Sequence, residues 1–362
     1  MNYRPNIVRK HILKTYLITG GAGFIGSNFI NYMLSKYGSD VYIINLDALT
    51  YAGNLENLKN VEKNKNYKFI KGNICNKDFI LSLFKEFEIN YVVNFAAETH
   101  VDKSIKNPEI FFKSNVEGTL NLLENAKRAW IKSEIYDEYK DNCKFLQIST
   151  DEVYGSLGES GFFTENTNLS PNSPYSSSKA SADLLIRSFF KTYKMPINIT
   201  RCSNNYGPYQ FPEKLIPLSI QKTLKCEKIP IYGDGLNIRD WLFVKDHCSA
   251  IDAVLNNGKP GEIYNIGGNN EKTNIEIVKL IIDNIKNTTG VNINENLIEF
   301  ITDRKGHDRR YAIDSSKIKK DLSWEPKTSF EKGIKETIDW YLNNKDWLEN
   351  IKTGKYKTYT NN

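Results

Sequence analysis

The sequence is poor in cysteine and has no long apolar run. Its five cysteines among 362 residues are odd in number and lack the paired spacing of zinc ligands, which argues against a disulfide framework or a metal site. No apolar run approaches the about 18 residues that a membrane helix requires, and the basic first fourteen residues are not followed by a secretory core. We therefore expect a cytoplasmic protein that binds no metal and no membrane.

An excess of charge of one sign is also missing. The 49 basic and 43 acidic residues give a formal net charge of +6 and are spread along the chain, without a basic block with interleaved aromatic residues. This pattern argues against nucleic acid as a partner. A hydrophobic content of 40% in a chain of this length can bury one large core or two modest ones, and no internal repeat is visible.

A glycine-rich loop follows the first predicted strand, which spans residues 15–19. The loop, residues 20–26, contains the pattern Gly-x-Gly-x-x-Gly and leads into an amphipathic helix, whose amino end can hold a pyrophosphate. A second predicted strand, residues 41–46, ends in Asp47, about twenty residues beyond the loop, where a carboxylate would bind the adenosine ribose. This order predicts an NAD site, and Asp47 favours NAD over NADP.

Strands and helices alternate over the first 200 residues, which predicts an α/β fold with a doubly wound parallel sheet of the Rossmann type. After residue 200 the chain turns to short elements and tight turns, which predicts a smaller α/β substrate-binding domain. We expect an extension without an assignable role over 1–14, the NAD-binding domain over 15–200, rejoined near 240–268, and mainly substrate-binding residues over 201–362. The further predicted strands are 67–70, 91–95, 145–148 and 197–200, and the predicted helices are 77–87, 115–130, 176–193, 244–255, 274–285 and 329–342.

Five polar residues form the candidate catalytic centre. Thr150, Asp151 and Glu152 follow the predicted strand 145–148, at the strand end where open α/β sheets bind ligands. Tyr175 and Lys179 begin a helical pattern and lie one turn apart on one face. A cation beside the phenol favours the phenolate, which a tyrosine needs to take a proton from an alcohol.

Simpler explanations exist for both groups. Acidic residues such as Asp151 and Glu152 also stabilise the start of a helix. Tyr175 and Lys179 also fit a packed aromatic residue beside a solvated lysine. The glycine loop and Thr150 favour the catalytic interpretation.

The chain resembles the extended short-chain dehydrogenase/reductase family and, within it, the dTDP-glucose 4,6-dehydratases. The resemblance covers nearly the whole chain from Lys14 onward. The specific match is the triplet Thr150, Asp151 and Glu152, because epimerases of similar fold usually have small neutral residues at the acidic pair. The stretches that carry the resemblance are 19–26, 96–102, 149–155, 175–179, 201–217, 238–241 and 303–311.

This resemblance implies a hydro-lyase that converts dTDP-glucose into dTDP-4-keto-6-deoxy-glucose. Tyr175 would take the 4-hydroxyl proton while hydride passes to NAD, with Thr150 bonded to the same oxygen and Lys179 acidifying the phenol and holding the nicotinamide ribose. Glu152 would then remove the C5 proton, and Asp151 would protonate the departing C6 hydroxyl. The hydride would return to C6, and the product would enter deoxysugars such as rhamnose for surface polysaccharide.

The resemblance also implies a set of contacts to tightly bound NAD. The family usually has aspartate where this chain has Asn73, whose amide oxygen can still accept from the adenine amino group, so we expect weaker binding at most. The implied cofactor residues are Gly20, Gly23, Phe24, Ile25, Gly26, Asp47, Leu49, Thr50, Asn73, Ile74, Ala96, Ala97, Thr99, Ser114, Tyr175, Lys179 and Asn205.

The implied contacts to the nucleotide sugar include two arginines, whose planar guanidinium groups suit a diphosphate. Whether the base is thymine or uracil follows from the resemblance alone, so a UDP-glucose 4,6-dehydratase stays an alternative. A nucleotide-sugar 4-epimerase and an inactive NAD-binding sensor or scaffold are further alternatives. The implied substrate residues are Thr99, Thr150, Asn204, Lys214, Leu215, Pro230, Tyr232, Arg239, Asn274, Arg304 and His307.

Two predicted helices, 115–130 and 175–193, carry apolar residues at helical spacing, including Val116, Leu120 and Leu184. In the family that the chain resembles, the corresponding helices form a four-helix contact between two subunits, which implies a homodimer. Burial within one chain would produce the same pattern.

Overall fold

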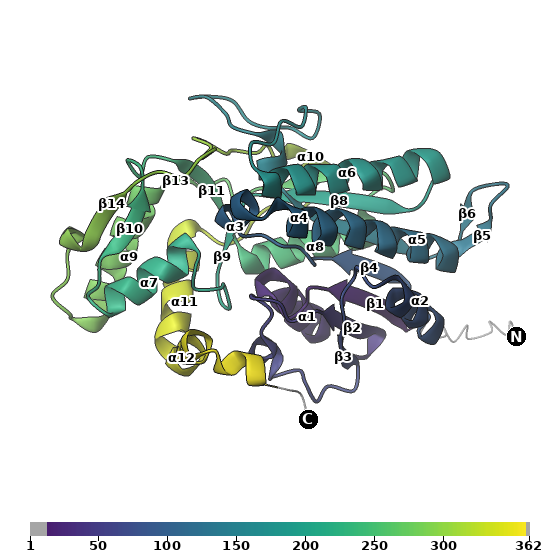
Figure 1. The fold of residues 1–362 in the computed structure, drawn as a ribbon, viewed down its shortest axis with the longest axis horizontal. Helices are drawn as coiled ribbons and strands as arrows, with labels where there is room; N and C mark the ends of the chain where they lie inside the picture. Colours follow the sequence, from purple (N-terminus) through teal and green to yellow (C-terminus); the bar gives the residue numbers. More distant parts are fainter. Residues whose placement is uncertain (1–12, 360–362) are drawn as a thin grey trace, which may run out of the picture.

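A seven-stranded parallel sheet forms the centre of the larger lobe in the computed structural model, which describes residues 13–359 (Figure 1). The order β12-β8-β7-β4-β1-β2-β3 and the parallel pairing of every neighbour confirm the predicted doubly wound α/β fold. The strands are β1 (Lys14–Thr19), β2 (Val41–Asp47), β3 (Tyr67–Lys71), β4 (Tyr91–Asn94), β7 (Lys144–Thr150), β8 (Ile197–Cys202) and β12 (Ile263–Ile266).

Helices cover both faces of this sheet, because successive strand residues point to opposite faces and both faces are apolar. Ile18 packs in one buried cluster with α1 and α8, whereas its neighbour Leu17 packs in another with α2, α5 and α6. The bounds are α1 (Phe24–Tyr37), α2 (Lys77–Glu86), α5 (Gly118–Trp130), α6 (Pro174–Tyr193) and α8 (Val244–Asn257).

The smaller lobe is built from the later part of the chain around a core of isoleucines and aromatic residues. Figure 1 shows it on the left, with α7, α9, β10 and β14 side by side. Its sheets are β10 paired with β14, and the three-stranded β13-β11-β9. The elements are β9 (Asn204–Tyr206), α7 (Leu215–Leu224), β10 (Ile229–Tyr232), β11 (Ile238–Phe243), β13 (Glu271–Thr273), α9 (Asn274–Thr289), β14 (Ile298–Ile301), α11 (Phe330–Asn343) and α12 (Lys345–Thr353).

The chain returns to the large sheet within this region, since α8 packs on α1 and β12 pairs with β8. Further short helices, strands and turns lie between these elements. They are α3 (Val101–Lys106), α4 (Pro108–Phe112), a π-helical turn (Lys113–Glu117), β5 (Ile131–Ser133), β6 (Glu138–Tyr139), the 3-10 turn η4 (Asp151–Tyr154) and α10 (Ser316–Leu322).

The strand order reverses between β1 and β4, so their carboxyl ends border the crevice where open α/β sheets bind ligands. Thr19, Asp47, Asn94 and Thr150 end the four strands β1, β2, β4 and β7 at this edge. Across residues 13–359, no helix has the length and apolar character to cross a membrane. The predicted extension over 1–14 lies, up to residue 12, outside the described residues.

Candidate active site

The glycine loop has the shape of a phosphate cradle. Gly20 has φ of +68°, and a Cβ atom there would lie 2.7 Å from the backbone nitrogen of Ala96. A Cβ atom on Gly26 would lie 2.4 Å from the carbonyl oxygen of Gly20, so a side chain at either position would clash with backbone. The first turn of α1 carries no acidic residue and has no side-chain cap, and its backbone N–H groups can therefore bind an anion.

Asp47 connects this loop to the next one. Its Oδ2 accepts from the Ala22 N–H at 2.9 Å and its Oδ1 from the Leu49 N–H at 2.8 Å. Burial raises the pKa of Asp47, and these two backbone bonds oppose the rise. The carboxyl group is thus fixed at the carboxyl end of β2, where the sequence predicts the ribose contact.

The other predicted cofactor residues line the same edge. The Ala96 N–H donates to Thr19 Oγ1 at 3.3 Å, and the hydroxyl of Tyr51, next to Thr50, lies 3.2 Å from the Thr99 hydroxyl. Asn73 follows β3, and its Oδ1 already accepts from the Cys75 N–H at 2.9 Å, which fixes the direction of the amide. The residues that this edge brings together are Gly20, Gly23, Phe24, Ile25, Gly26, Asp47, Leu49, Thr50, Asn73, Ile74, Ala96, Ala97 and Thr99.

Ser114 and Asn205 approach from other elements. Ser114 lies in the π-helical turn beside Asn115, whose amide bonds both backbone groups of Glu98 and the Ser178 hydroxyl. Asn205 lies on β9, and its Oδ1 is 2.8 Å from Nδ1 of His247. The first network ties the π-helical turn and α6 to the loop after β4, and the second ties β9 to α8.

The acidic pair lies in the turn η4, directly after β7. Thr150 caps this turn, because its Oγ1 accepts from the Glu152 N–H at 3.3 Å and lies 3.2 Å from Asp151 Oδ1. Asp151 is 1% exposed, and its Oδ2 has no hydrogen-bond partner among the described residues. This buried carboxyl oxygen can therefore bond a further group.

Tyr175 and Lys179 lie on the first turns of α6, which begins where it does because Ser173 and Ser176 form a capping box and Pro174 occupies the first turn. Both side chains are buried, and Lys179 Nζ donates to the Ile148 carbonyl oxygen at 2.6 Å. The ring of Phe111 packs edge-on against Tyr175. The helix cap thus sets where the phenol stands relative to β7.

The two carboxyl groups lie in different electrostatic surroundings. Burial raises the pKa of Asp151 well above its usual range, and the neighbouring Glu152 and Asp240 carboxylates raise it further. Burial also raises the pKa of Glu152, but Arg304, Arg239 and Lys214 oppose that rise. Asp151 therefore favours its protonated form more strongly than Glu152 does, a division that suits one acid and one base.

The expected acidification of the Tyr175 phenol is not seen in this structure. Burial raises the pKa of Tyr175 well above 10, and the Glu152 carboxylate raises it further. Burial likewise lowers the pKa of Lys179. Low polarity around the pair outweighs the attraction that the spacing alone predicts.

The smaller lobe supplies cationic and aromatic side chains opposite these carboxyls. Arg239 on β11 is 5% exposed and stacks 4.3 Å from the ring centroid of Tyr311. Lys214 Nζ lies 3.4 Å from the Thr99 carbonyl oxygen, so it joins the two lobes. Arg304 has a buried Nε without a partner among the described residues, which leaves a donor free for a ligand.

The remaining predicted substrate residues surround this group. The rings of Tyr232 and His307 meet edge-on with centroids 6.2 Å apart, and His307 Nδ1 lies 2.6 Å from Asp303 Oδ1. The Asn274 N–H donates to the carbonyl oxygen of Asn237, two residues before Arg239. On separate elements of the same lobe lie Asn204 (β9), Leu215 (α7) and Pro230 (β10).

Two residues at this site escaped the sequence analysis. The Tyr311 hydroxyl donates to Asp308, and the nearby Glu152 carboxylate adds to the rise of the Tyr311 pKa. Glu213 Oε1 is buried without a hydrogen-bond partner among the described residues and lies 3.9 Å from Lys214 Nζ, and its Oε2 lies 3.5 Å from Nε2 of His100. Glu213 and Tyr311 lie within the stretches 201–217 and 303–311, which carry the family resemblance. Their position in these stretches is the sequence signal that could have identified them.

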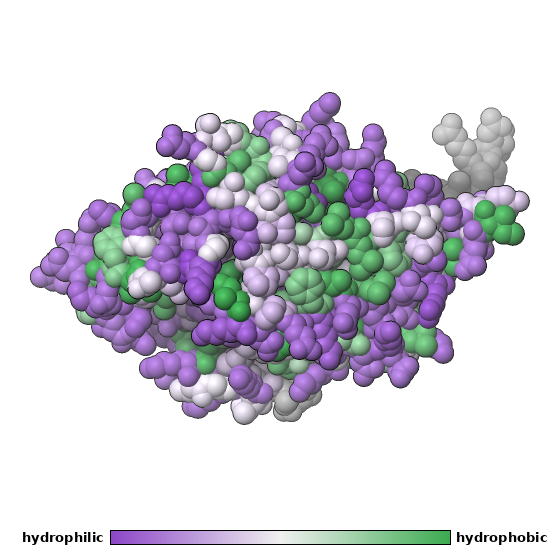
Figure 2. Space-filling model, turned by 45° about the horizontal axis from the view of Figure 1, so that its top comes forward, coloured by the Kyte–Doolittle hydropathy of each residue, from purple (hydrophilic) through white to green (hydrophobic). Residues whose placement is uncertain are grey.

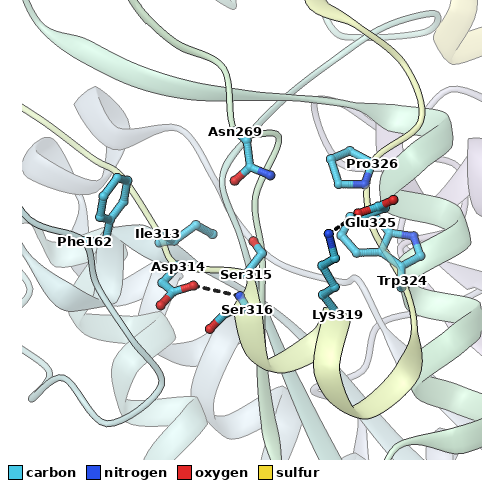
Figure 3. A pocket seen from close by; sticks show the side chains of 10 residues that line it. All are labelled: Phe162, Asn269, Ile313, Asp314, Ser315, Ser316, Lys319, Trp324, Glu325 and Pro326. Atoms are coloured by element: carbon cyan, nitrogen blue, oxygen red, sulfur yellow. Dashed lines mark hydrogen bonds and ion pairs between the residues drawn. The ribbon is translucent and has the colours of Figure 1, made fainter.

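A separate cavity of about 390 Å³ contains none of the predicted residues (Figure 3). Two pairs of its polar groups bond each other: Lys319 pairs with Glu325 at 2.6 Å, and Asp314 accepts from the Ser316 N–H at 2.7 Å. The cavity brings together no acid, base and cation set comparable with that of the crevice. Within residues 13–359 no group of three or more His, Cys, Asp or Glu is arranged to hold a metal ion.

Known proteins match this chain over nearly its whole length. A dTDP-glucose 4,6-dehydratase of Xanthomonas campestris pv. campestris (strain B100) is 51% identical over 348 residues, which cover 95% of this chain and 98% of the relative. A crystal structure of dTDP-glucose 4,6-dehydratase from Bacillus anthracis str. Ames in complex with NAD is 52% identical, with a TM-score of 0.83, covering 93% of this chain and 99% of that one.

A second solved structure, dTDP-glucose 4,6-dehydratase from Streptomyces venezuelae with NAD bound, has a TM-score of 0.85 and 42% identity, covering 93% of this chain and 99% of that one. The model of the family described as GDP-mannose 4,6 dehydratase matches residues 17–337. These findings confirm the resemblance to extended short-chain dehydrogenases/reductases, and the chain belongs to the GDP-mannose 4,6-dehydratase family.

Proposed function

We propose that this protein is a hydro-lyase that converts dTDP-glucose into dTDP-4-keto-6-deoxy-glucose with NAD as a resident cofactor. The observation that carries the proposal is the presence of two carboxyl groups with different surroundings, Asp151 and Glu152, beside the buried Tyr175 and Lys179. An alcohol oxidation needs only the second pair. An elimination of water needs a separate acid and base, which the first pair supplies.

The cofactor contacts are part of the proposal. The glycine cradle and the free N–H groups of α1 would hold the pyrophosphate, and Asp47 would hold the ribose. When bound, NAD would supply the hydride acceptor for oxidation at C4 and the hydride donor for reduction at C6. Support comes from the fit of these residues and from the NAD complexes of the related dTDP-glucose dehydratases.

In the first step Tyr175 removes the proton of the 4-hydroxyl group, and Thr150 hydrogen-bonds the same oxygen. Because burial and the Glu152 carboxylate raise the pKa of the phenol, Tyr175 needs a nearby positive charge at the moment of reaction. Lys179 is fixed one turn along α6 by its bond to Ile148 and provides that charge.

In the second step Glu152 removes the C5 proton, which the 4-ketone acidifies, and Asp151 protonates the leaving 6-hydroxyl group. The three cations near Glu152 favour its ionised form, as a base requires. The buried position of Asp151 favours its protonated form, as an acid requires. With a hydride delivered to C6, the protonated Glu152 would give a proton back to C5, while Asp151 would regain a proton from solvent and Tyr175 would release the one it took from the 4-hydroxyl group.

The nucleotide diphosphate would lie against the smaller lobe. Arg239 and Arg304 offer guanidinium groups, and Arg304 Nε has no partner among the described residues. We propose thymine as the base from the named relatives, since the residues themselves do not distinguish it from uracil. Incubation with dTDP-glucose and, separately, with UDP-glucose, followed by mass spectrometry, tests this choice. Equal turnover of both would contradict the assignment to thymine.

We also propose a homodimer, which rests on an exposed apolar helix face. This face consists of Ile105, Ile110, Phe112, Leu120 and Leu184, from α3, α4, α5 and α6, and these side chains are 39–56% exposed. Figure 2 shows apolar side chains gathered over this side of the molecule. Pairing α5 and α6 with the same helices of a second copy would form a four-helix contact and cover it.

Light scattering coupled to size-exclusion chromatography tests the dimer. Leu184→Glu places a charge within the apolar helix face and should yield a monomer. Phe300→Glu, at an equally exposed position on β14, serves as the matched control and should leave the dimer intact. A monomeric unaltered protein at micromolar concentration would contradict the proposal.

The place of the enzyme in the cell is a further part of the proposal. All five cysteines carry free thiols, which supports a reducing compartment such as the cytoplasm. The 4-keto-6-deoxy product is a precursor for deoxysugars, and we propose that it serves rhamnose and surface polysaccharide synthesis.

A further inference from the structure

A buried ion pair fastens the helix that carries Tyr175 and Lys179 to the central sheet. Arg201 Nε donates to Asp183 Oδ2 at 2.9 Å, and the two side chains are 4% and 1% exposed. Asp183 lies on α6 one helical turn after Lys179. Arg201 lies on β8, opposite Ser149 of β7. The pair therefore joins α6 to the sheet one residue away from Thr150.

The same guanidinium reaches the turn that carries the acidic pair. Arg201 Nη1 donates to the Tyr154 hydroxyl at 2.9 Å, and Arg201 Cζ lies 4.8 Å from the centroid of the Tyr154 ring. Tyr154 ends η4, two residues after Glu152, and is 2% exposed. Its hydroxyl donates in turn to Asn265 Oδ1 at 2.8 Å on β12. The turn is thus held from two sides.

A buried ion pair gains little net stability over apolar side chains of the same volume, because both charges lose their water. Its directional hydrogen bonds, in contrast, set the distance between the elements that they join. Here those elements are α6 and η4. Tyr175 and Lys179 lie on the first, and Asp151 and Glu152 on the second.

We propose that Arg201 and Tyr154 are positioning residues that hold the Asp151–Glu152 turn at the distance from Tyr175 and Lys179 at which oxidation and elimination act on one bound sugar. This inference rests on the proposed function. Lys179 ties α6 to β7 independently, through Ile148. Loss of the Tyr154 bond therefore frees the acidic turn while the phenol and the ammonium stay in place.

The test is Tyr154→Phe, which removes only the hydroxyl. Elimination should slow about 10- to 100-fold, the loss expected for a small misplacement of a catalytic group, while C4 oxidation continues. Reduced cofactor should then accumulate during turnover. The kinetic isotope effect of C5-deuterated substrate should rise and that of C4-deuterated substrate should fall, because the slow step has moved.

The matched control is Tyr139→Phe. The Tyr139 hydroxyl donates to the Tyr193 carbonyl oxygen at 2.9 Å, at the far end of α6, so this variant loses one hydrogen bond to the same helix without touching η4. It should keep the isotope effects of the unaltered protein. Arg201→Lys, which keeps a positive charge beside Asp183 but loses the fork that reaches Tyr154, should reproduce the Tyr154→Phe shift.

Two outcomes would overturn the inference. If folded Tyr154→Phe and Arg201→Lys lose stability or active fraction but keep unchanged isotope effects, the network has a structural role only. If the unaltered protein gives no 4-keto-6-deoxy product from dTDP-glucose or UDP-glucose, the proposed function fails and the inference fails with it. The activity of the unaltered protein distinguishes the two cases.

Discussion

Lys179 Nζ donates a hydrogen bond to the carbonyl oxygen of Ile148 at 2.6 Å, two residues before Thr150. This bond joins the start of α6 to the end of β7, so the residues proposed for oxidation are fixed to the strand that leads into the acidic turn. The backbone connection therefore places the oxidation pair, Tyr175 and Lys179, next to the elimination pair, Asp151 and Glu152. Their electrostatic coupling follows, since the Glu152 carboxylate raises the pKa of Tyr175.

Glu152→Gln should stop elimination while leaving C4 oxidation possible, because the two steps use different bases. The loss of a general base predicts turnover slower by about 10²- to 10⁴-fold. Absorbance of reduced nicotinamide should appear on mixing with dTDP-glucose and persist. A folded variant that holds cofactor but neither reduces it nor turns over would show that our division of roles between Tyr175 and Glu152 is wrong.

The same substitution should move the pH dependence of C4 oxidation. Tyr175 acts as a base, so oxidation gains rate as pH rises through its pKa. Glu152 raises that pKa, and removal of its negative charge therefore lowers it. In single-turnover measurements, the rate of C4 oxidation should begin to rise at lower pH in Glu152→Gln than in the unaltered protein. A rise that begins at the same pH or at higher pH would contradict the coupling.

Asn73→Asp should tighten NAD binding. The amide oxygen of Asn73 is fixed by the Cys75 N–H, and a carboxylate at this position would accept the adenine amino group with a charge-assisted bond. We expect a gain in affinity of about 3- to 10-fold, measured by calorimetry on protein freed of cofactor.

Asn76→Asp is the control for this substitution. Asn76 caps α2 through the Phe79 N–H, so the variant adds the same charge three residues away without the adenine contact. Equal affinities of Asn73→Asp and Asn76→Asp would show that the charge acts without specific contact to adenine.

The sequence predicted the large sheet well because buried parallel strands appear as short apolar runs. The run 145–148 lies inside β7, yet the strand extends from Lys144 to Thr150. Ser149 and Thr150 belong to the strand because they continue the pairing with β8, and Lys144 belongs to it because it pairs with Tyr91 of β4, which only the folded sheet reveals.

At the site, too, the sequence did not reveal contacts between elements that are far apart in the chain. Motifs placed Thr150, Asp151, Glu152, Tyr175 and Lys179 at one edge of the sheet, because strand ends and helix starts leave local signals. The link from Asp183 through Arg201 to Tyr154 joins three separate elements, and no local pattern indicates it. The raised pKa of Tyr175 also depends on burial, which spacing along a helix does not report.

His247 should make the protein acid-sensitive. Asn205 Nδ2 donates to the Ser203 carbonyl oxygen, so its Oδ1 faces His247 Nδ1, and the neutral ring is the donor. Burial lowers the pKa of His247 from 6.5 to about 3. The unfolded chain therefore binds a proton below pH 6.5 that the folded protein does not, and stability falls as pH falls through that value.

From pH 7 to pH 5 this proton costs about 2 kcal/mol of unfolding free energy. His247→Gln lacks the titrating ring. In urea unfolding with saturating NAD, its unfolding free energy should therefore fall by about 2 kcal/mol less between pH 7 and pH 5 than that of the unaltered protein. Between pH 7 and pH 8 the two proteins should change alike, because His247 is neutral in both states. If the unfolding free energies of the two proteins fall by the same amount down to pH 5, the folded protein must bind this proton as well.

The last prediction follows a single hydride through the whole reaction. An enzyme that oxidises C4, eliminates water and reduces C6 on one retained cofactor must carry the C4 hydrogen to C6. Substrate deuterated at C4 should therefore give product with that deuterium at C6. Unlabelled substrate turned over in heavy water should gain solvent deuterium at C5, where Glu152 exchanges its proton. A 4-epimerase would return the label to C4 and leave C5 untouched, since it needs no acid and base acting across C5 and C6. A sensor would move neither label. Nuclear magnetic resonance of the product distinguishes these cases, and deuterium that stays at C4 or is lost to solvent would exclude the dehydratase assignment.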